Sequence, residues 1–119
     1  MSIEALWTTI FADGNDIAHF SGVVILHGGH VYGGDNNYHY HGHYRFDGEQ
    51  LALSLTASHF HGGRNPIAGD RDAFTLDLEG TPGEERMDLA GNLDHNPDAG
   101  VTVHMRRAAE LPDSGPSLV

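Results

Sequence analysis

The chain has 119 residues, of which 17 are acidic, six are basic and none is cysteine, so its formal net charge is −11. This length suits one domain with a single core. The lack of cysteine excludes disulfides, thiolate metal sites and a cysteine nucleophile. All six basic residues are arginines, and only Arg106 and Arg107 are adjacent. Because nucleic-acid binding needs a basic stripe, we expect no direct contact with nucleic acid.

The sequence gives no sign of export or membrane insertion. The opening segment Met1–Trp7 lacks a basic region followed by a long apolar run, which argues against a signal peptide. No stretch approaches the ~20 apolar residues of a membrane helix. We therefore expect a cytoplasmic protein with no membrane partner.

Eight strands and no helix are expected, because apolar and alternating runs are separated by short turns rich in glycine, proline, asparagine and aspartate. The expected strands are Glu4–Phe11, Ala18–His27, His30–Tyr32, Asn37–Phe46, Glu49–Phe60, Asp72–Glu79, Arg86–Leu93 and Val101–Arg107. The segment Asn96–Gly100 is predicted to be the last turn. Alternation is lost afterwards, so we predict a domain over residues 1–107 and a disordered tail over 108–119.

The first hairpin turn is Gly28-Gly29, because two-residue turns of types I′ and II′ need positive φ angles. This turn predicts the facing pairs His27–His30, Leu26–Val31 and Ile25–Tyr32.

Asp47-Gly48 predicts a second hairpin. Its expected pairs are Phe46–Glu49, Tyr44–Leu51, Gly42–Leu53 and Tyr40–Leu55. The tyrosines then share the leucine face, which we assign to the core. His39, His41 and His43 fall on the outer face, because neighbouring side chains on a strand point to opposite faces. The residues expected opposite them are Thr56, Ser54 and Ala52.

Alternation continues in the later strands. For example, Phe74, Leu76 and Leu78 alternate with Thr75, Asp77 and Glu79. One apolar face on each strand predicts one enclosed core, in either a closed barrel or a two-sheet sandwich.

His39, His41 and His43 have the His-x-His spacing found in many metal sites. Three such residues along one strand span ~13 Å, too far for a single ion. No carboxylate is expected opposite them. We therefore predict no evolved metal site and no cofactor, although adventitious nickel or zinc binding is compatible with the ladder.

His59 and His61 extend the leucine face of their strand, so they are candidates to point into one barrel mouth, near Asp35. Together the three residues form a possible ligand site. The alternative is a solvated strand end, with Asp35 in an Asx-type corner. No nucleophile elbow or paired acid/base carboxylates are evident, so we expect no enzyme.

The segment from Gly22 to Tyr44 resembles the GrlR-type negative regulators of type III secretion, which carry a similar "GVV-L--G-V-GGD---Y-G-Y" pattern. The resemblance covers roughly Ala5 to Arg107 and is weak after Gly62. It implies an all-β, antiparallel up-and-down eight-stranded lipocalin-like β-barrel. Members of that family are bacterial proteins that dimerise and sequester a transcriptional activator without enzymatic chemistry.

The resemblance implies a partner-binding role for Asp47 and Glu49, although the family's hairpin has a longer acidic run. The partner is expected to be a basic protein, given the charge of this chain. The weakly charged strip of His39, His41 and His43, flanked by Ala52, Ser54, Thr56 and Phe60, is the predicted homodimer interface, because like-charged protomers should meet where their charge is lowest. The alternative function is a carrier that binds an apolar small molecule inside the barrel.

Overall fold

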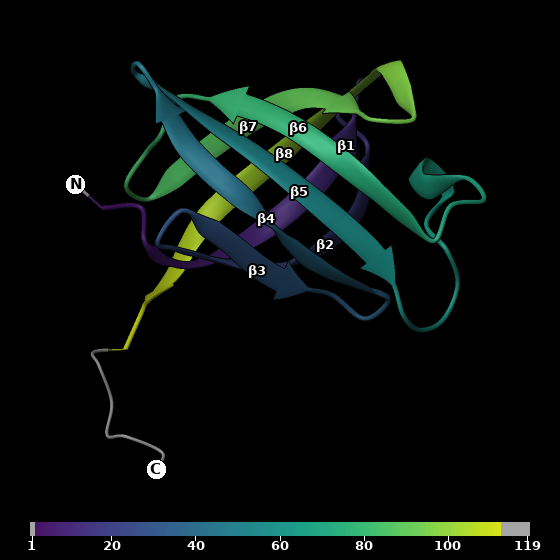
Figure 1. Ribbon diagram of the computed structural model, residues 1–119, viewed down its shortest axis with the longest axis horizontal. Coiled ribbons are helices and arrows are strands. Elements are labelled where there is room, and N and C mark those ends of the chain that lie inside the picture. The colour runs from purple at the N-terminus through teal and green to yellow at the C-terminus, as the bar shows by residue number, and fades with distance from the viewer. Residues whose placement is uncertain (1, 113–119) are drawn as a thin grey trace.

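The computed structural model describes residues 2–112, which form a closed barrel of eight antiparallel strands (Figure 1). The strands are β1 (Ala5–Asp13), β2 (Ala18–His27), β3 (His30–Gly34), β4 (Tyr38–Asp47), β5 (Gln50–His59), β6 (Ala73–Gly80), β7 (Arg86–Leu93) and β8 (Asn96–Glu110). Each strand pairs with the next, and β8 pairs with β1 to complete the ring. The predicted all-β barrel is thus confirmed over the sandwich, and closure leaves no free sheet edge.

The Gly28-Gly29 hairpin has the predicted register. Its two strands pair His27 with His30, Leu26 with Val31 and Ile25 with Tyr32. Both glycines have positive φ, 58° and 83°. A two-residue turn of this kind matches the twist of the flanking strands.

The second hairpin shows the predicted faces but not the predicted partners. Asp47 pairs with Gln50, so the turn residues are Gly48 and Glu49, and every facing pair is displaced by two residues from the prediction. Tyr44, for example, faces Leu53 instead of Leu51. A displacement of two leaves each side chain on its predicted face, because strand side chains alternate with period two.

The last strand is longer at both ends than predicted. Asn96 already pairs with Leu93, and the register then jumps so that Gly100 pairs with Asn92. The predicted turn at 96–100 is therefore wrong. It is an irregular stretch of β8, where Pro97 lies among the residues without a β7 partner.

β8 also pairs with β1 as far as Glu110, so the predicted tail boundary at residue 108 is wrong. Residues 113–119 of the predicted tail lie outside the described residues.

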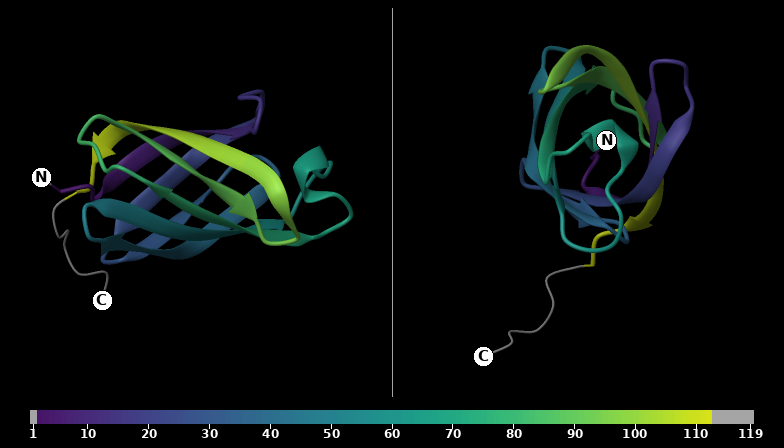
Figure 2. Two further views of the ribbon diagram at one scale, coloured as in Figure 1. Left: turned by 90° about the horizontal axis from the view of Figure 1, so that it is seen from above. Right: turned by 90° about the vertical axis from the view of Figure 1, so that its right-hand side faces the viewer.

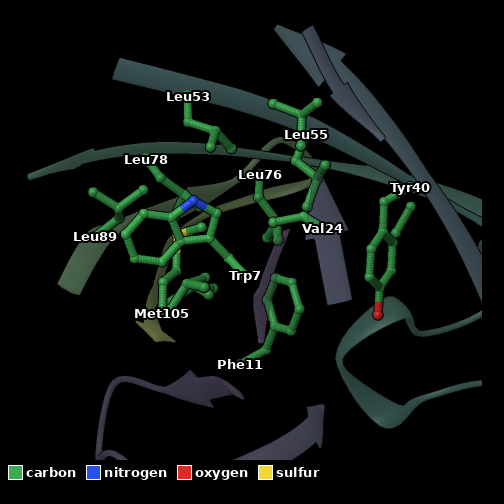
Figure 3. Packing of buried hydrophobic residues seen from close by; sticks show 14 of the residues in the cluster. Trp7, Phe11, Val24, Tyr40, Leu53, Leu55, Leu76, Leu78, Leu89 and Met105 are labelled. Atoms are coloured by element: carbon green, nitrogen blue, oxygen red, sulfur yellow. The ribbon is translucent and has the colours of Figure 1, made fainter. Parts of the chain in front are cut away.

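The core fills the barrel with the inward side chains of all eight strands. Trp7, Phe11, Leu55, Leu76 and Leu89 are 0–2% exposed, and Figure 3 shows the Trp7 indole among leucines from several strands. The void lined by Phe11, Leu55, Leu89 and their neighbours measures only ≈ 10 Å³. The interior is therefore packed with protein.

One polar side chain belongs to this interior. Thr9 is 2% exposed, lines the small void, and its hydroxyl has no hydrogen-bond partner among the described residues.

Small residues let strands approach closely where the barrel bends. Gly91 on β7 has its Cα so near β6 that an added Cβ would lie 1.7 Å from the Asp77 carbonyl oxygen. A side chain at this position would have to displace the neighbouring backbone.

A single turn of 3₁₀ helix, η1 (Pro66–Ala68), is the only helical element among the described residues. The sequence did not predict it. No helix in the described part of the chain is long and apolar enough to cross a membrane.

Candidate functional site

The barrel mouth brings the predicted Asp35 and His59 to one end of the molecule, but their polar groups are already engaged. The Asp35 carboxylate accepts hydrogen bonds from the backbone N–H groups of Asn37 (2.7 Å) and Tyr38 (2.8 Å) and from the Tyr40 hydroxyl. Burial, together with the bond to Asp35, raises the pKa of Tyr40 far above its ordinary range, so the phenol remains a donor. Asp35 therefore forms the Asx-type corner.

The two predicted mouth histidines have different environments. The His59 ring packs edge-on against Tyr38, with the ring centroids 5.4 Å apart, and its Nε2 lies 2.7 Å from the Gly62 carbonyl oxygen. His61 is exposed, so its predicted inward orientation is wrong. The strand ends at His59, and beyond it the alternation that led to the prediction no longer applies.

The connection from β5 to β6, residues 60–72, extends across this end of the barrel, as the right-hand view of Figure 2 shows. The Asn65 N–H donates to the Tyr38 hydroxyl at 2.9 Å, and Ala68 is fully buried. A hollow of ≈ 240 Å³ remains at the margin of this connection, partly lined by Asp35 and Tyr38. None of its lining residues lines the void inside the barrel.

Where β2, β3 and β4 pair with one another, their outward side chains include no aspartate, glutamate or arginine; Arg45 and Asp47 of β4 lie beyond the end of β3. We call this paired surface the β2–β4 face and define it by the outward residues Ser21, Val23, Ile25, His27, His30, Tyr32, Gly34, His39, His41 and His43. Large apolar groups are open to solvent here, with Val23 41%, Ile25 37% and Tyr32 53% exposed. Exposed apolar groups gathered on a charge-free surface are typical of an interaction site.

The three histidines of the predicted dimer strip point outward as expected and lie on this face, whereas Ala52, Ser54 and Thr56, which were predicted to flank them in the strip, lie on β5 outside it. The His39 and His41 rings stack with their centroids 6.2 Å apart, and His39 lies a similar distance from Phe60. His43 faces Ser54 on β5 and His30 on β3.

The pairing of His30 with His43 was not predicted, because it depends on the register between β3 and β4. The sequence does contain one indication of this register, the Asx corner at Asp35. The corner closes the short β3–β4 connection, and the length of that connection determines which residues of β3 and β4 face each other.

A groove of ≈ 360 Å³ crosses the outside of β4 to β7. Small residues, among them Ala52, Ser54 and Gly91, leave room for it. Asp77 and Glu79 line one part and are exposed, and neither forms an ion pair within residues 2–112. Arg45 also lines the groove, so the lining carries one positive and two negative side chains.

The predicted partner-binding residues Asp47 and Glu49 lie at the tip of the β4–β5 hairpin. Both are exposed, and the adjacent Phe46 is 56% exposed. An exposed apolar ring next to two solvated carboxylates offers both apolar area and negative charge to a protein contact.

His104 on β8 connects two distant parts of the acidic surface. Its Nε2 lies 2.7 Å from an Asp16 oxygen, and its Nδ1 lies 2.7 Å from an Asp88 oxygen. The hydrogen bond to Asp16, followed by the one to Asp88, raises the pKa of His104 above 6.5. When it is protonated, the ring donates to both carboxylates and ties the β1–β2 loop to β7.

We expect this bridge to stabilise the fold only while His104 is protonated. Since its pKa is raised in the folded state, its contribution is complete below about pH 6.5 and is lost as pH rises through the folded value. His104→Gln should lower the free energy of unfolding at about pH 6 by less than ~1 kcal/mol, because the pairs are exposed, and by less still at about pH 9.

Urea titrations of both proteins across this pH range measure the effect, with His61→Gln as the control. A difference between wild type and His104→Gln that does not shrink with rising pH would contradict the bridge.

No group of three metal-ligating side chains in the described ranges is arranged to hold one ion. The fold and its surfaces thus define a small, packed antiparallel β-barrel whose distinctive features lie on its outside. No protein-family model matches the chain, and no curated protein sequence matches it.

Proposed function

We propose that this protein is a non-enzymatic regulator that acts by binding a basic protein partner with its outer surface, as a homodimer. The observation that carries the proposal is the contrast between a filled interior and an outer surface with an exposed apolar face and a carboxylate-lined groove.

The packed interior weighs against the carrier alternative. A pocket for a drug-sized ligand has a volume of about 300–1,000 Å³, whereas the void inside the barrel measures ≈ 10 Å³. A ligand would have to displace core side chains such as Leu55 and Leu89, and such displacement disrupts close packing.

The surface charge favours a basic partner. The formal net charge is −11, and the groove beside Asp77 and Glu79 and the tip with Asp47 and Glu49 both present exposed carboxylates. Opposite fields steer association and raise its rate. The β2–β4 face lacks carboxylates and is therefore the surface where two acidic copies repel each other least.

The resemblance of residues 22–44 to the GrlR-type regulators supports the same class of function, since those proteins sequester an activator. The shorter acidic hairpin of this chain suggests a different partner. In this proposal the dimer uses the β2–β4 face and the partner uses the hairpin tip and the side of the groove that carries Asp77 and Glu79; the two surfaces meet at His43, which lines the groove.

The partner should be recovered by co-purification from the native host at low salt and identified by mass spectrometry. With the purified partner, the association rate should fall steeply as salt rises, because steering is screened over ~8 Å at physiological ionic strength. Stopped-flow or surface plasmon resonance measures that rate.

A matched pair of variants separates docking from overall charge. Asp47→Asn with Glu49→Gln removes two charges at the hairpin tip. Asp70→Asn with Asp98→Asn removes two exposed charges at the opposite end of the barrel. We expect only the first variant to speed dissociation of the complex. Equal effects would reject docking at the tip, and failure to recover any protein partner would reject the proposal.

A further inference from the structure

His30 and His43 form a pair of neighbouring imidazoles on adjacent strands. They are directly opposite in the β3–β4 register, both are exposed, and their ring centroids are 5.5 Å apart. The backbone near the pair is fixed, because the Tyr44 N–H donates to the Gly29 carbonyl oxygen at 2.9 Å.

The spacing of the two rings suits a shared metal ion. Metal–nitrogen bonds of about 2.0–2.1 Å place two imidazoles that bind one tetrahedral ion with their centroids about 5 Å apart. The observed separation of 5.5 Å is close to that value. Two imidazole ligands favour zinc, nickel or copper over calcium or magnesium, which prefer oxygen ligands.

The pair alone does not complete a metal site. Its neighbours in the same row are His27 and Ser54, and His27 is directed to Glu4, with Nδ1 and Oε2 3.3 Å apart. No third ligating side chain joins the pair within residues 2–112. A structural zinc ion usually has four protein ligands, so two must come from elsewhere.

A second copy of the chain can supply them. The pair lies on the β2–β4 face, which carries no carboxylate in a protein of net charge −11. A two-fold interface brings the same patch of both copies together. A two-fold axis through the pair would place four imidazoles around one point, with exposed Tyr32 and Ile25 beside it.

We propose that His30 and His43 from each of two copies bind one zinc-class ion, and that this ion fastens the homodimer. The inference rests on the dimer in the proposed function and adds that this dimer requires a bound metal ion. The ion supplies a positive charge that the surface between the two acidic protomers lacks.

Sedimentation velocity of the untagged full chain tests the inference. After treatment with EDTA and its removal, zinc or nickel chloride should double the mass, with saturation at one ion per two chains, and magnesium chloride should have no effect. His30→Ala and His43→Ala should each abolish the response. His61→Ala, which removes an exposed histidine at the opposite end of the barrel, should retain it.

The same experiment separates this inference from the proposed dimer. A dimer that persists in EDTA and in His43→Ala, but dissociates with Tyr32→Arg, supports the interface and overturns the metal site. A response to zinc that survives in both histidine variants, or binding of one ion per chain without dimerisation, also overturns it. A monomer under every condition rejects the metal site and the dimer together.

Discussion

Replacing Trp7 with alanine should lower the free energy of unfolding by about 3–5 kcal/mol, the cost of deleting a large buried side chain and leaving a cavity. Trp7 is 0% exposed and lies among buried side chains from several strands (Figure 3). Its indole N–H donates to the Ile3 carbonyl oxygen at 2.9 Å. The variant also loses that bond, which leaves a buried acceptor without its partner.

The Trp7 side chain also helps to hold the N-terminal segment on the barrel. Arg107 lies over the indole, 5.6 Å from its centroid, and donates to the Ser2 carbonyl oxygen. Trp7→Ala should therefore loosen residues 2–4 as well as the core.

Urea denaturation followed by far-UV circular dichroism measures the loss, because the variant has no tryptophan for fluorescence. Trp7→Phe is the control, since it keeps most of the apolar area and loses the N–H donor, and it should cost less than half as much. A cost for Trp7→Ala below about 1 kcal/mol would mean that the indole is not central to the core.

The sequence predicted the strands and their faces more reliably than the partners across the second hairpin. Gly28 and Gly29 both tolerate positive φ, so a two-residue turn had one possible position. At Asp47-Gly48 only the glycine has positive φ, 64°. A turn centred on both residues would need the same of Asp47, and the chain instead turns at Gly48 and Glu49.

Other features depended on contacts between distant segments. The extension of β8 to Glu110 follows from β1, which offers Leu6 and Ala5 as partners for Ala109 and Glu110. Local alternation carries no information about such a partner. The 3₁₀ turn η1 likewise depends on Asn65, whose side chain accepts from the Ile67 N–H and whose backbone donates to Tyr38.

The candidate surfaces were predictable only in part. The outward position of His39, His41 and His43 followed from the alternation of one strand. The charge-free β2–β4 face required three strands in register, and the His30–His43 pair required the β3–β4 register in particular. A surface on the outside of a barrel contains residues from several neighbouring strands. The pattern along one strand therefore predicts which residues point outward, but it does not predict which residues of other strands lie beside them.

Leu55→Ala should lower the free energy of unfolding by about 2–5 kcal/mol, whereas His41→Ala should change it by less than about 0.5 kcal/mol. Leu55 on β5 is 2% exposed, and it faces Gly42 on β4 and Leu76 on β6. With so small a neighbour as Gly42, the cavity left by Leu55→Ala has few side chains to collapse into it. His41 is exposed on the opposite face, between Tyr32 and Thr56.

The pair of variants tests which face of β4 and β5 points to the core. A register error of one residue would exchange the buried environment of Leu55 with the exposed environment of His41. The two-residue difference between the predicted and observed β4–β5 register leaves both environments unchanged. Urea titrations of both variants, followed by the fluorescence of Trp7, give the two free energies. A severe loss for His41→Ala with a mild one for Leu55→Ala would mean that β4 and β5 direct the opposite face to the core.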